Sequence, residues 1–213
     1  MKVITYIFLL AYLTAQSKYP ADEILSSPDV PIIHKIGLLP IAAWQRISYN
    51  SNIFNCQFYP SCSNYGAQAV KQFGIIRGGI IASERITRCN PRAYHYHLEL
   101  QKPFHEKDGR MIDPVIQKET QQQKVSPFRA ALISTIVPGA GRMYSGRISD
   151  GIFGLYSFSI YGYAAYDSNK NGRKFAGPLL GLIASYVYLS EIYGAWRTAV
   201  SYTHLTLPTK RIV

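Results

Sequence analysis

Acidic residues and cysteines are scarce in this sequence of 213 residues. It has 12 Asp and Glu against 23 Lys and Arg, which gives a formal net charge of +11, and only three cysteines. Three cysteines are too few for a small fold held together by disulfides. Charged residues make up only 16% of the chain whereas 47% is hydrophobic, and this balance excludes an intrinsically disordered protein. The positive excess predicts an anionic partner, either nucleic acid or an acidic membrane surface.

Most of the positive charge lies in two blocks of sequence. A polar stretch without net charge separates them. Residues 30–98 contain seven basic residues and one acidic residue, and residues 128–200 contain seven and three. The length suits one domain or two small ones. We therefore predict two units with a linker at residues 116–127.

The two ends of the chain have the character of segments outside the fold. Lys2, the apolar run from Val3 to Leu13 and the small residues of Ala15-Gln16-Ser17 predict a signal peptide at residues 1–17. An uncleaved anchor or a buried helix is the alternative. Residues 201–213 fit no preceding pattern, and we interpret them as a non-native tail, with a natural frayed terminus as the alternative.

The segment from Ile75 to Cys89 has the periodicity of an amphipathic helix. At 100° per residue, Arg77, Arg85 and Arg88 share one face and small or apolar residues share the other. This pattern predicts a helix with its arginines outward. The face is either simply solvated or lies on a membrane surface.

Two later segments approach the length of a membrane span. Residues 148–166 are free of charge except for Asp150, and residues 175–196 are free of charge except for Glu191. A short turn-forming stretch connects them. We expect a membrane-spanning hairpin module at residues 128–200, in which the stretch 130–140 is a candidate third, re-entrant or interfacial, segment. A soluble hairpin with a tyrosine-rich core is the alternative.

Cys56, Cys62 and Cys89 allow three interpretations. One pair forms a disulfide if the domain is exported. The three thiols bind zinc together with His95 or His97, although their spacing is wider than in zinc knuckles. In the third interpretation they are buried structural thiols.

Catalytic motifs are missing from the sequence. It contains no P-loop, no Gly-x-Ser-x-Gly elbow and no His-Glu-x-x-His helix. Glu106, Asp108 and Asp113 lie in a polar stretch where a solvated surface is expected. Aromatic residues near Lys71 and Arg77 permit single-strand nucleic-acid binding, but an exported membrane protein would not meet nucleic acid. We therefore predict a protein that is not an enzyme, has no cofactor and does not bind nucleic acid.

Residues 36–91 contain a characteristic set of motifs, namely Trp44-Gln45-Arg46-Ile47-Ser48, Cys56-x-Phe58-x-Pro60-Ser61-Cys62-Ser63-x-Tyr65, Ala69, Gly74, Gly78 and Arg85-x-x-Arg88-Cys89-Asn90-Pro91. With these motifs the segment resembles the membrane protein insertion efficiency factor family (YidD), and Asp113-Pro114-Val115 is similar to the closing motif of that family. The stretch between Pro91 and Asp113 is longer than the short link usual in the family.

The resemblance implies a domain at residues 30–115 and a non-enzymatic role beside the insertion machinery of the bacterial inner membrane. We expect an all-α fold in which this basic domain precedes two membrane helices. Arg46, Arg77, Arg85 and Arg88 are the candidates for binding anionic lipid or an acidic partner, and Cys56, Cys62 and Cys89 are expected to be structural. The alternative function is an exported protein that is lytic or modifies lipids and inserts through its hairpin.

Overall fold

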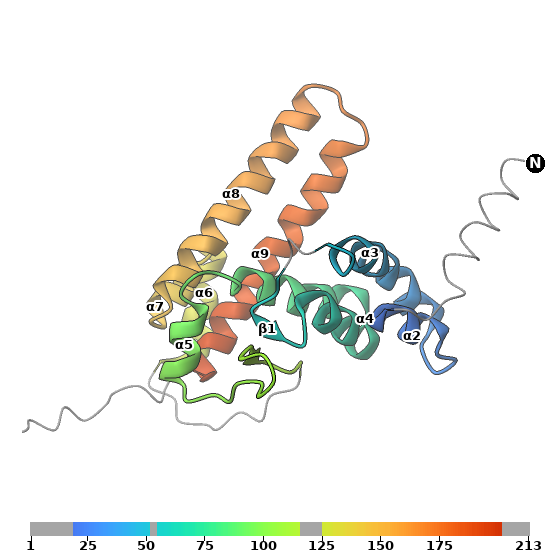
Figure 1. Cartoon of the computed structure of the whole chain (residues 1–213). Coiled ribbons are helices and arrows are strands. Elements are labelled where there is room, and N and C mark those ends of the chain that lie inside the picture. Colours follow the sequence, from blue (N-terminus) through green and yellow to red (C-terminus); the bar gives the residue numbers. More distant parts are fainter. Residues whose placement is uncertain (1–18, 52–54, 116–124, 202–213) are drawn as a thin grey trace, which may run out of the picture.

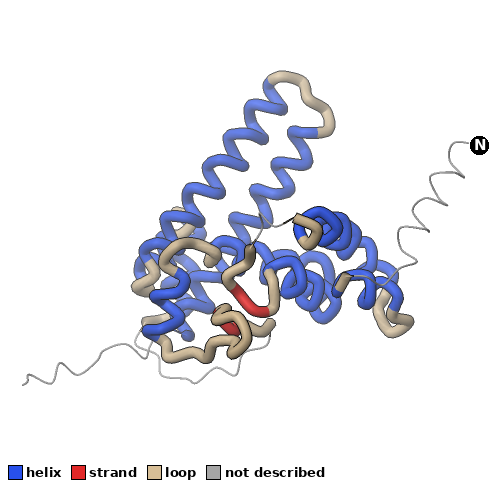
Figure 2. The backbone as a smooth tube through the Cα atoms, in the orientation of Figure 1, coloured by secondary structure: helices blue, strands red, loops and turns tan. Residues whose placement is uncertain are grey.

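The computed structural model describes residues 19–51, 55–115 and 125–201 (Figure 1). The protein is mostly helical, as predicted, with one sheet of two short strands (Figure 2). The helices are α2 (Pro20–Ser26), α3 (Ile32–Ser48), α4 (Cys62–Thr87), α5 (Ala93–Glu99), α6 (Pro127–Ile136), α7 (Ala140–Tyr144), α8 (Ile148–Lys170) and α9 (Ala176–Ser201); the strands are β1 (Phe58–Tyr59) and β2 (Met111–Ile112).

Helix α4 folds back on itself at Gly74. Ser61 caps its start, because the Ser61 hydroxyl accepts a hydrogen bond from the backbone N–H of Asn64 at 3.3 Å. Gly74 has φ 80° and ψ 179°, so the chain turns sharply between residues 62–73 and 75–87. The two halves pack so closely that a Cβ at Gly78 would lie 2.5 Å from the carbonyl oxygen of Ala69. The first half also contacts α2 and α3, where Leu38 and Ala67 are part of a small apolar core.

The short sheet joins two segments that are far apart in the sequence. β1 pairs in parallel with β2, with Phe58 opposite Met111 and Tyr59 opposite Ile112. This pairing brings the segment around β2 against the start of α4 and buries Asp113, which is 1% exposed. The prediction of a solvated surface is therefore wrong for Asp113, because pairing with β1 holds its segment inside the fold.

Helices α8 and α9 form the predicted hairpin. They run antiparallel, project from the rest of the molecule and turn at Gly172, which has φ 68° (Figures 1 and 2). Helices α6 and α7 pack at the base of this hairpin. The candidate third segment at 130–140 lies mainly in α6. Helix α9 packs on α4, where a Cβ at Gly79 would lie 2.6 Å from the ring of Tyr186.

The predicted membrane-spanning character of this hairpin is wrong. Among residues 19–51, 55–115 and 125–201, the structure has no helix that combines the length and the apolar character needed to cross a membrane. Tyrosine, serine and glycine recur along both helices and lower their hydropathy. Each helix also contains a carboxylate, Asp150 in α8 and Glu191 in α9, and both are fully buried against arginines.

Several predictions concern residues outside the described parts of the chain. The signal peptide at residues 1–17 lies there, as does nearly all of the tail at 201–213. Of the predicted linker at 116–127, the structure describes only residues 125–127. Ser126 caps α6 there by accepting a hydrogen bond from the N–H of Arg129.

Candidate functional site

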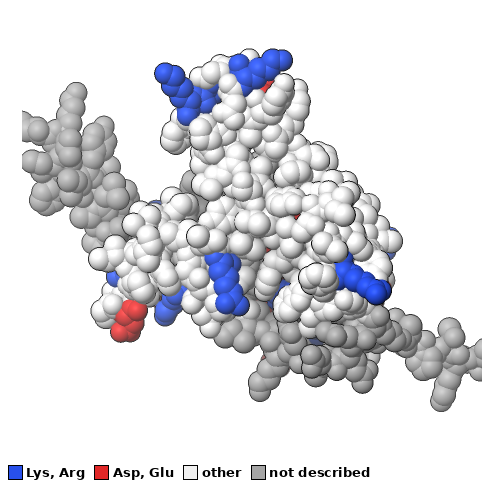
Figure 3. Space-filling model, turned by 180° about the vertical axis from the view of Figure 1, so that it is seen from behind, with Lys and Arg blue, Asp and Glu red and all other residues white. Residues whose placement is uncertain are grey.

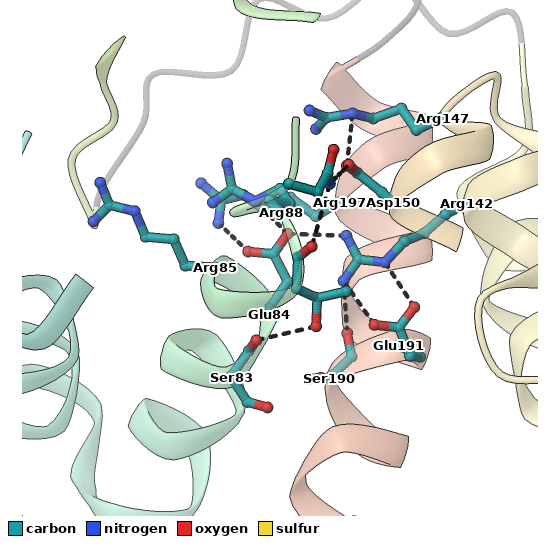
Figure 4. Close-up of polar contacts among 12 residues, drawn as sticks. Ser83, Glu84, Arg85, Arg88, Arg142, Arg147, Asp150, Ser190, Glu191 and Arg197 are labelled. Carbon is teal, nitrogen blue, oxygen red and sulfur yellow. Dashed lines mark hydrogen bonds and ion pairs between the residues drawn. The ribbon is translucent and has the colours of Figure 1, made fainter. Parts of the chain in front are cut away.

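A cluster of buried charged side chains lies where α4, α7, α8 and α9 meet (Figure 4). Its centre is Glu84, whose carboxylate accepts contacts from three arginines. The Nε of Arg88 lies 2.7 Å from Oε1, the NH1 of Arg142 lies 3.3 Å from Oε1, and the NH1 of Arg197 lies 2.9 Å from Oε2. Glu84 is 1% exposed, so these contacts compensate a charge that is shielded from water.

Asp113 is the second anion of the cluster. Its Oδ2 lies 2.8 Å from the NH2 of Arg88 and 3.3 Å from the Nε of Arg85. Arg88 thus bridges Glu84 and Asp113. Arg85 also donates to the carbonyl oxygen of Pro60 at 2.9 Å and lies over the ring of Tyr65, 4.2 Å from its centroid.

Two further pairs extend the cluster into the hairpin. Arg142 donates from Nε to Glu191 at 2.9 Å. Asp150 lies 2.9 Å from the Nε of Arg147 and accepts a hydrogen bond from the side chain of Asn90 at 2.6 Å. Arginines and carboxylates from the YidD-like segment and from the C-terminal helices therefore contribute to one network.

The arginines decide the charge state of the central carboxylates. Burial by itself would raise the pKa of Glu84, but Arg88, Arg197 and Arg142 outweigh it and lower this pKa to about 2. The pKa of Asp113 is lowered in the same way, against its burial, by Arg88, Arg197 and Arg85. Burial lowers the pKa of Lys102 at the edge of the cluster to about 8, and Arg88 and Arg197 add to this effect. Glu84 and Asp113 are therefore ionised at neutral pH.

The four predicted lipid-binding arginines are placed in two different environments. Arg85 is fully buried and Arg88 is 6% exposed, so the prediction that they face outward with Arg77 is wrong. The C-terminal helices and the segment of β2 cover their face of α4. Arg77 is exposed and lies over the ring of Phe73 at 4.8 Å. Arg46 is partly exposed and is paired with the buried Asp22 at 2.9 Å.

The three cysteines converge at the start and end of α4. All three are free thiols, and the Sγ atoms of Cys56 and Cys62 are 3.4 Å apart. Cys89 also interacts with Cys62, and its Sγ accepts a hydrogen bond from the side chain of Gln57 at 3.3 Å. Cys56 and Cys62 pack against the small core of Phe58, Ala93 and Met111.

The zinc interpretation of the cysteines finds no support in the described part of the chain. Within those residues, no group of three or more His, Cys, Asp and Glu side chains is arranged to hold a metal ion. His97 is buried and contacts the carbonyl oxygen of Pro103 at 2.9 Å, and His95 pairs with Glu99 at 3.2 Å. Both imidazoles are thus engaged away from the thiols.

The α8–α9 hairpin has an exposed apolar surface and a basic tip. Its large exposed side chains include Ile152, Tyr156, Tyr163, Tyr166, Leu179 and Leu182. Lys170, Arg173 and Lys174 lie exposed at the turn between α8 and α9. In the space-filling view, basic residues mark the end of the projection, and the surface beneath them is almost uncharged (Figure 3). This segregation is unlike the mixed charge of an ordinary soluble surface.

Comparison with known proteins assigns a segment within the first half of the chain. The family described as "Putative membrane protein insertion efficiency factor" (YidD) matches residues 33–97. A protein of that name from Oleidesulfovibrio alaskensis is 49% identical over 61 residues, which make up 28% of this chain and 69% of the relative. Another, from Colwellia psychrerythraea, is 44% identical over 57 residues, 27% of this chain and 70% of the relative. The chain belongs to the YidD family. No solved structure matches it.

The YidD match confirms the predicted resemblance and separates the cluster into two groups. Glu84, Arg85 and Arg88 lie within the matched residues 33–97, as do the three cysteines. Other members of the cluster lie outside this range, namely Asp113, Arg142, Arg147, Asp150, Glu191 and Arg197. The buried cluster therefore joins the YidD region to the C-terminal helices.

Sequence reasoning missed the role of the residues that complete the cluster. Asp150 and Glu191 were visible as the lone charges in two apolar segments. A charge in such a segment is buried only if it is paired, and the nearest unassigned partners along the chain were Arg142, Arg147 and Arg197. The signal was present, but the pairing depends on how the helices pack.

Proposed function

We propose that this YidD protein is a non-enzymatic accessory factor that assists the insertion of integral membrane proteins near the translocon or insertase of the bacterial inner membrane. The name of its relatives, "Putative membrane protein insertion efficiency factor", supports this role. Membrane insertion machinery and anionic lipids are its proposed partners.

The observation that carries the proposal is the exposed apolar surface of the α8–α9 hairpin and its basic tip. Large side chains such as Ile152, Tyr156 and Leu179 are left in contact with solvent there. Contiguous surfaces of this kind are typical of sites that contact a membrane or an apolar partner. Tyrosine is well suited to the headgroup boundary, because its ring is apolar and its hydroxyl is polar. We propose that this surface rests against the acyl chains of one leaflet.

Charge supports the same arrangement. Lys170, Arg173 and Lys174 would meet anionic headgroups, each contributing about 1 kcal/mol near the surface. In the YidD region we propose Arg77, which is exposed, as a lipid or partner contact. Arg46 is a weaker contact because Asp22 already compensates its charge. Arg85 and Arg88 would act on the membrane only indirectly, by holding the hairpin base in place.

The test is an insertion assay in proteoliposomes that contain the bacterial insertase. The yield of a client membrane protein in the protease-protected state is measured with and without the purified full chain. We expect a yield that is several-fold higher with the protein and reduced again for Arg77→Glu. Equal yields with and without the wild-type protein would contradict the proposal. Leakage of dye from protein-treated vesicles without insertase would instead support a membrane-lytic protein.

A further inference from the structure

Two thiols in direct contact lie at the start of α4. The Sγ atoms of Cys56 and Cys62 are 3.4 Å apart, and a disulfide requires about 2.05 Å. The change needed is therefore little more than 1 Å. Cys62 is the first residue of α4, whereas Cys56 belongs to the preceding loop. Closure of the bond thus requires a small movement of the loop towards a fixed helix.

The surroundings of the two sulfurs are unequal. The Sγ of Cys56 accepts a hydrogen bond from the backbone N–H of Cys62 at 3.3 Å, at the positive end of α4, and lies 3.4 Å from the Cys62 thiol, within hydrogen-bond distance. The hydrogen bond between the two sulfurs contributes most to lowering the pKa of Cys56, to about 5. The same bond raises the pKa of Cys62, and burial adds to this effect. Cys56 therefore loses its proton before Cys62 does, and the Cys62 thiol can then donate to the Cys56 thiolate.

We propose that Cys56 and Cys62 form a thiol–disulfide exchange site, in which Cys56 attacks an external disulfide and Cys62 resolves the product. This activity is additional to the proposed role in membrane insertion and does not depend on it. The substrate class is an accessible disulfide, of which oxidised glutathione is a simple representative. An arrangement with one reactive thiolate at a helix start and one protonated partner is what such exchange requires.

The reaction proceeds in two displacement steps. The Cys56 thiolate attacks one sulfur of the external disulfide; a new S–S bond forms, and the other half leaves as a thiolate. That thiolate takes the proton of Cys62. The Cys62 sulfur then attacks the sulfur of Cys56, and the second half leaves as a thiolate. Two cysteine sulfurs are oxidised by two electrons in total, and the external disulfide is reduced to one thiol and one thiolate.

Cys89 is the third thiol near this site and serves as the internal control. It is exposed, and the hydrogen bond with Cys62 contributes most to lowering its pKa, to about 7. No hydrogen bond links its sulfur to that of Cys56 among the described contacts, whereas Cys62 touches Cys56 directly. We therefore assign the resolving step to Cys62.

The experiment uses the reduced full chain and oxidised glutathione. Mass spectrometry of the digested wild-type protein is expected to show a disulfide between Cys56 and Cys62. Cys62→Ser is expected to stop at a mixed disulfide, with one glutathione on Cys56. Cys89→Ser is expected to behave like the wild type. Circular dichroism of each variant verifies that the helices are intact, and Cys62→Ala replaces Cys62→Ser if the latter does not fold.

A second readout measures reactivity without a disulfide product. Alkylation of Cys56 by iodoacetamide in the Cys89→Ser protein is expected to rise with a midpoint near pH 5. At pH 6 it should be roughly tenfold faster than alkylation of an ordinary cysteine, after allowing for the lower nucleophilicity of a less basic thiolate. A midpoint above pH 8 would overturn the proposal. So would a Cys62–Cys89 disulfide as the main product, or a mixed disulfide that forms on Cys89 alone.

Discussion

Arg197 of α9 donates from NH1 to Oε2 of Glu84 in α4 at 2.9 Å, with the carboxylate fully shielded from water. Glu84 lies inside the segment shared with the YidD family, and Arg197 lies about a hundred residues after that segment ends. A buried charge without a partner destabilises the fold, so loss of either Glu84 or Arg197 would leave the other side chain unpaired in the interior. This ion pair therefore helps to hold the C-terminal hairpin against the YidD region, in addition to apolar packing.

Removing the central anion should destabilise the whole protein. Glu84→Gln leaves Arg88, Arg142 and Arg197 with less compensation in a buried site. We expect a loss of about 3–5 kcal/mol in the free energy of unfolding, measured by urea denaturation. Glu106→Gln is the matched control, because Glu106 is exposed, and should change stability by less than about 0.5 kcal/mol. Equal effects of the two variants would contradict a stabilising role for the cluster.

The same cluster predicts loss of stability in acid. The pKa of Glu84 falls from an ordinary 4.5 to about 2 on folding, and that of Asp113 is also lowered. A carboxyl with a lowered folded pKa stabilises the fold above its unfolded pKa, and this stabilisation disappears as the pH falls through the folded value. Unfolding free energies should therefore decrease between about pH 5 and pH 2.

Glu191 changes the unfolding free energy with pH in the opposite direction to Glu84 over part of this pH range. Burial raises its pKa, so its contribution to stability falls as the pH rises above its unfolded value. The net profile is measured by urea denaturation at a series of pH values. Glu84→Gln should show a shallower decline than the wild type below pH 4.5. An identical slope in the two proteins would show that Glu84 does not carry the effect.

Lys102 should give a change at alkaline pH. Burial lowers its pKa to about 8 from an ordinary 10.5, so the unfolded chain binds more protons than the folded protein between these values. Its contribution to stability therefore increases as the pH rises from 8 to 10.5. Lys102→Met should remove this increase and be more stable than the wild type at pH 7. Lys107→Met, at an exposed position, should retain the wild-type profile.

Alanine substitutions at two glycines should have opposite effects on stability, because one glycine lies at a close helix contact and the other does not. Gly78→Ala would place a Cβ 2.5 Å from the backbone oxygen of Ala69, where neither half of α4 can move freely. We expect a loss of about 1–3 kcal/mol or more. Gly162→Ala in α8 is the matched control, since nothing lies within 4 Å of its Cβ, and should stabilise the helix by about 0.5–1 kcal/mol. Thermal unfolding compares the two, and a neutral Gly78→Ala would contradict the tight turn.

The tip of the hairpin should control binding to anionic vesicles. Replacement of Lys170, Arg173 and Lys174 by Glu is expected to weaken co-sedimentation with anionic vesicles by more than about 100-fold at low salt. The three residues are exposed, so the fold should be unaffected.

A control variant distinguishes this local effect from net charge. Replacing the exposed Lys71, Arg92 and Lys107 by Glu changes the net charge of the protein by the same amount. This variant should bind several-fold better than the tip variant. If the two lose binding equally, attraction by net charge explains the result and the tip has no special role.

Helix periodicity identified which residues share a face but not what covers that face. The 100° spacing grouped Arg77, Arg85 and Arg88 on one face, and yet Arg77 is exposed whereas Arg85 and Arg88 are buried. The reversal at Gly74 and the packing of α9 place Arg85 and Arg88 in the interior. Similarly, the lone charges Asp150 and Glu191 appeared as interruptions of membrane spans, whereas they are the buried ends of ion pairs.

The sequence by itself determined the YidD family, the helical character, the positive charge and the turn between the two C-terminal helices. These properties follow from local motifs, composition and periodicity, which a single chain displays directly. Only the tertiary structure decided that Asp113 is buried, that Cys56 touches Cys62 and that Glu84 meets Arg197. Such contacts join residues through the pairing of β1 with β2 and the packing of α4 with α9. Whether two residues far apart in the sequence come into contact depends on how all the helices and strands pack together, and a local sequence pattern does not specify this packing.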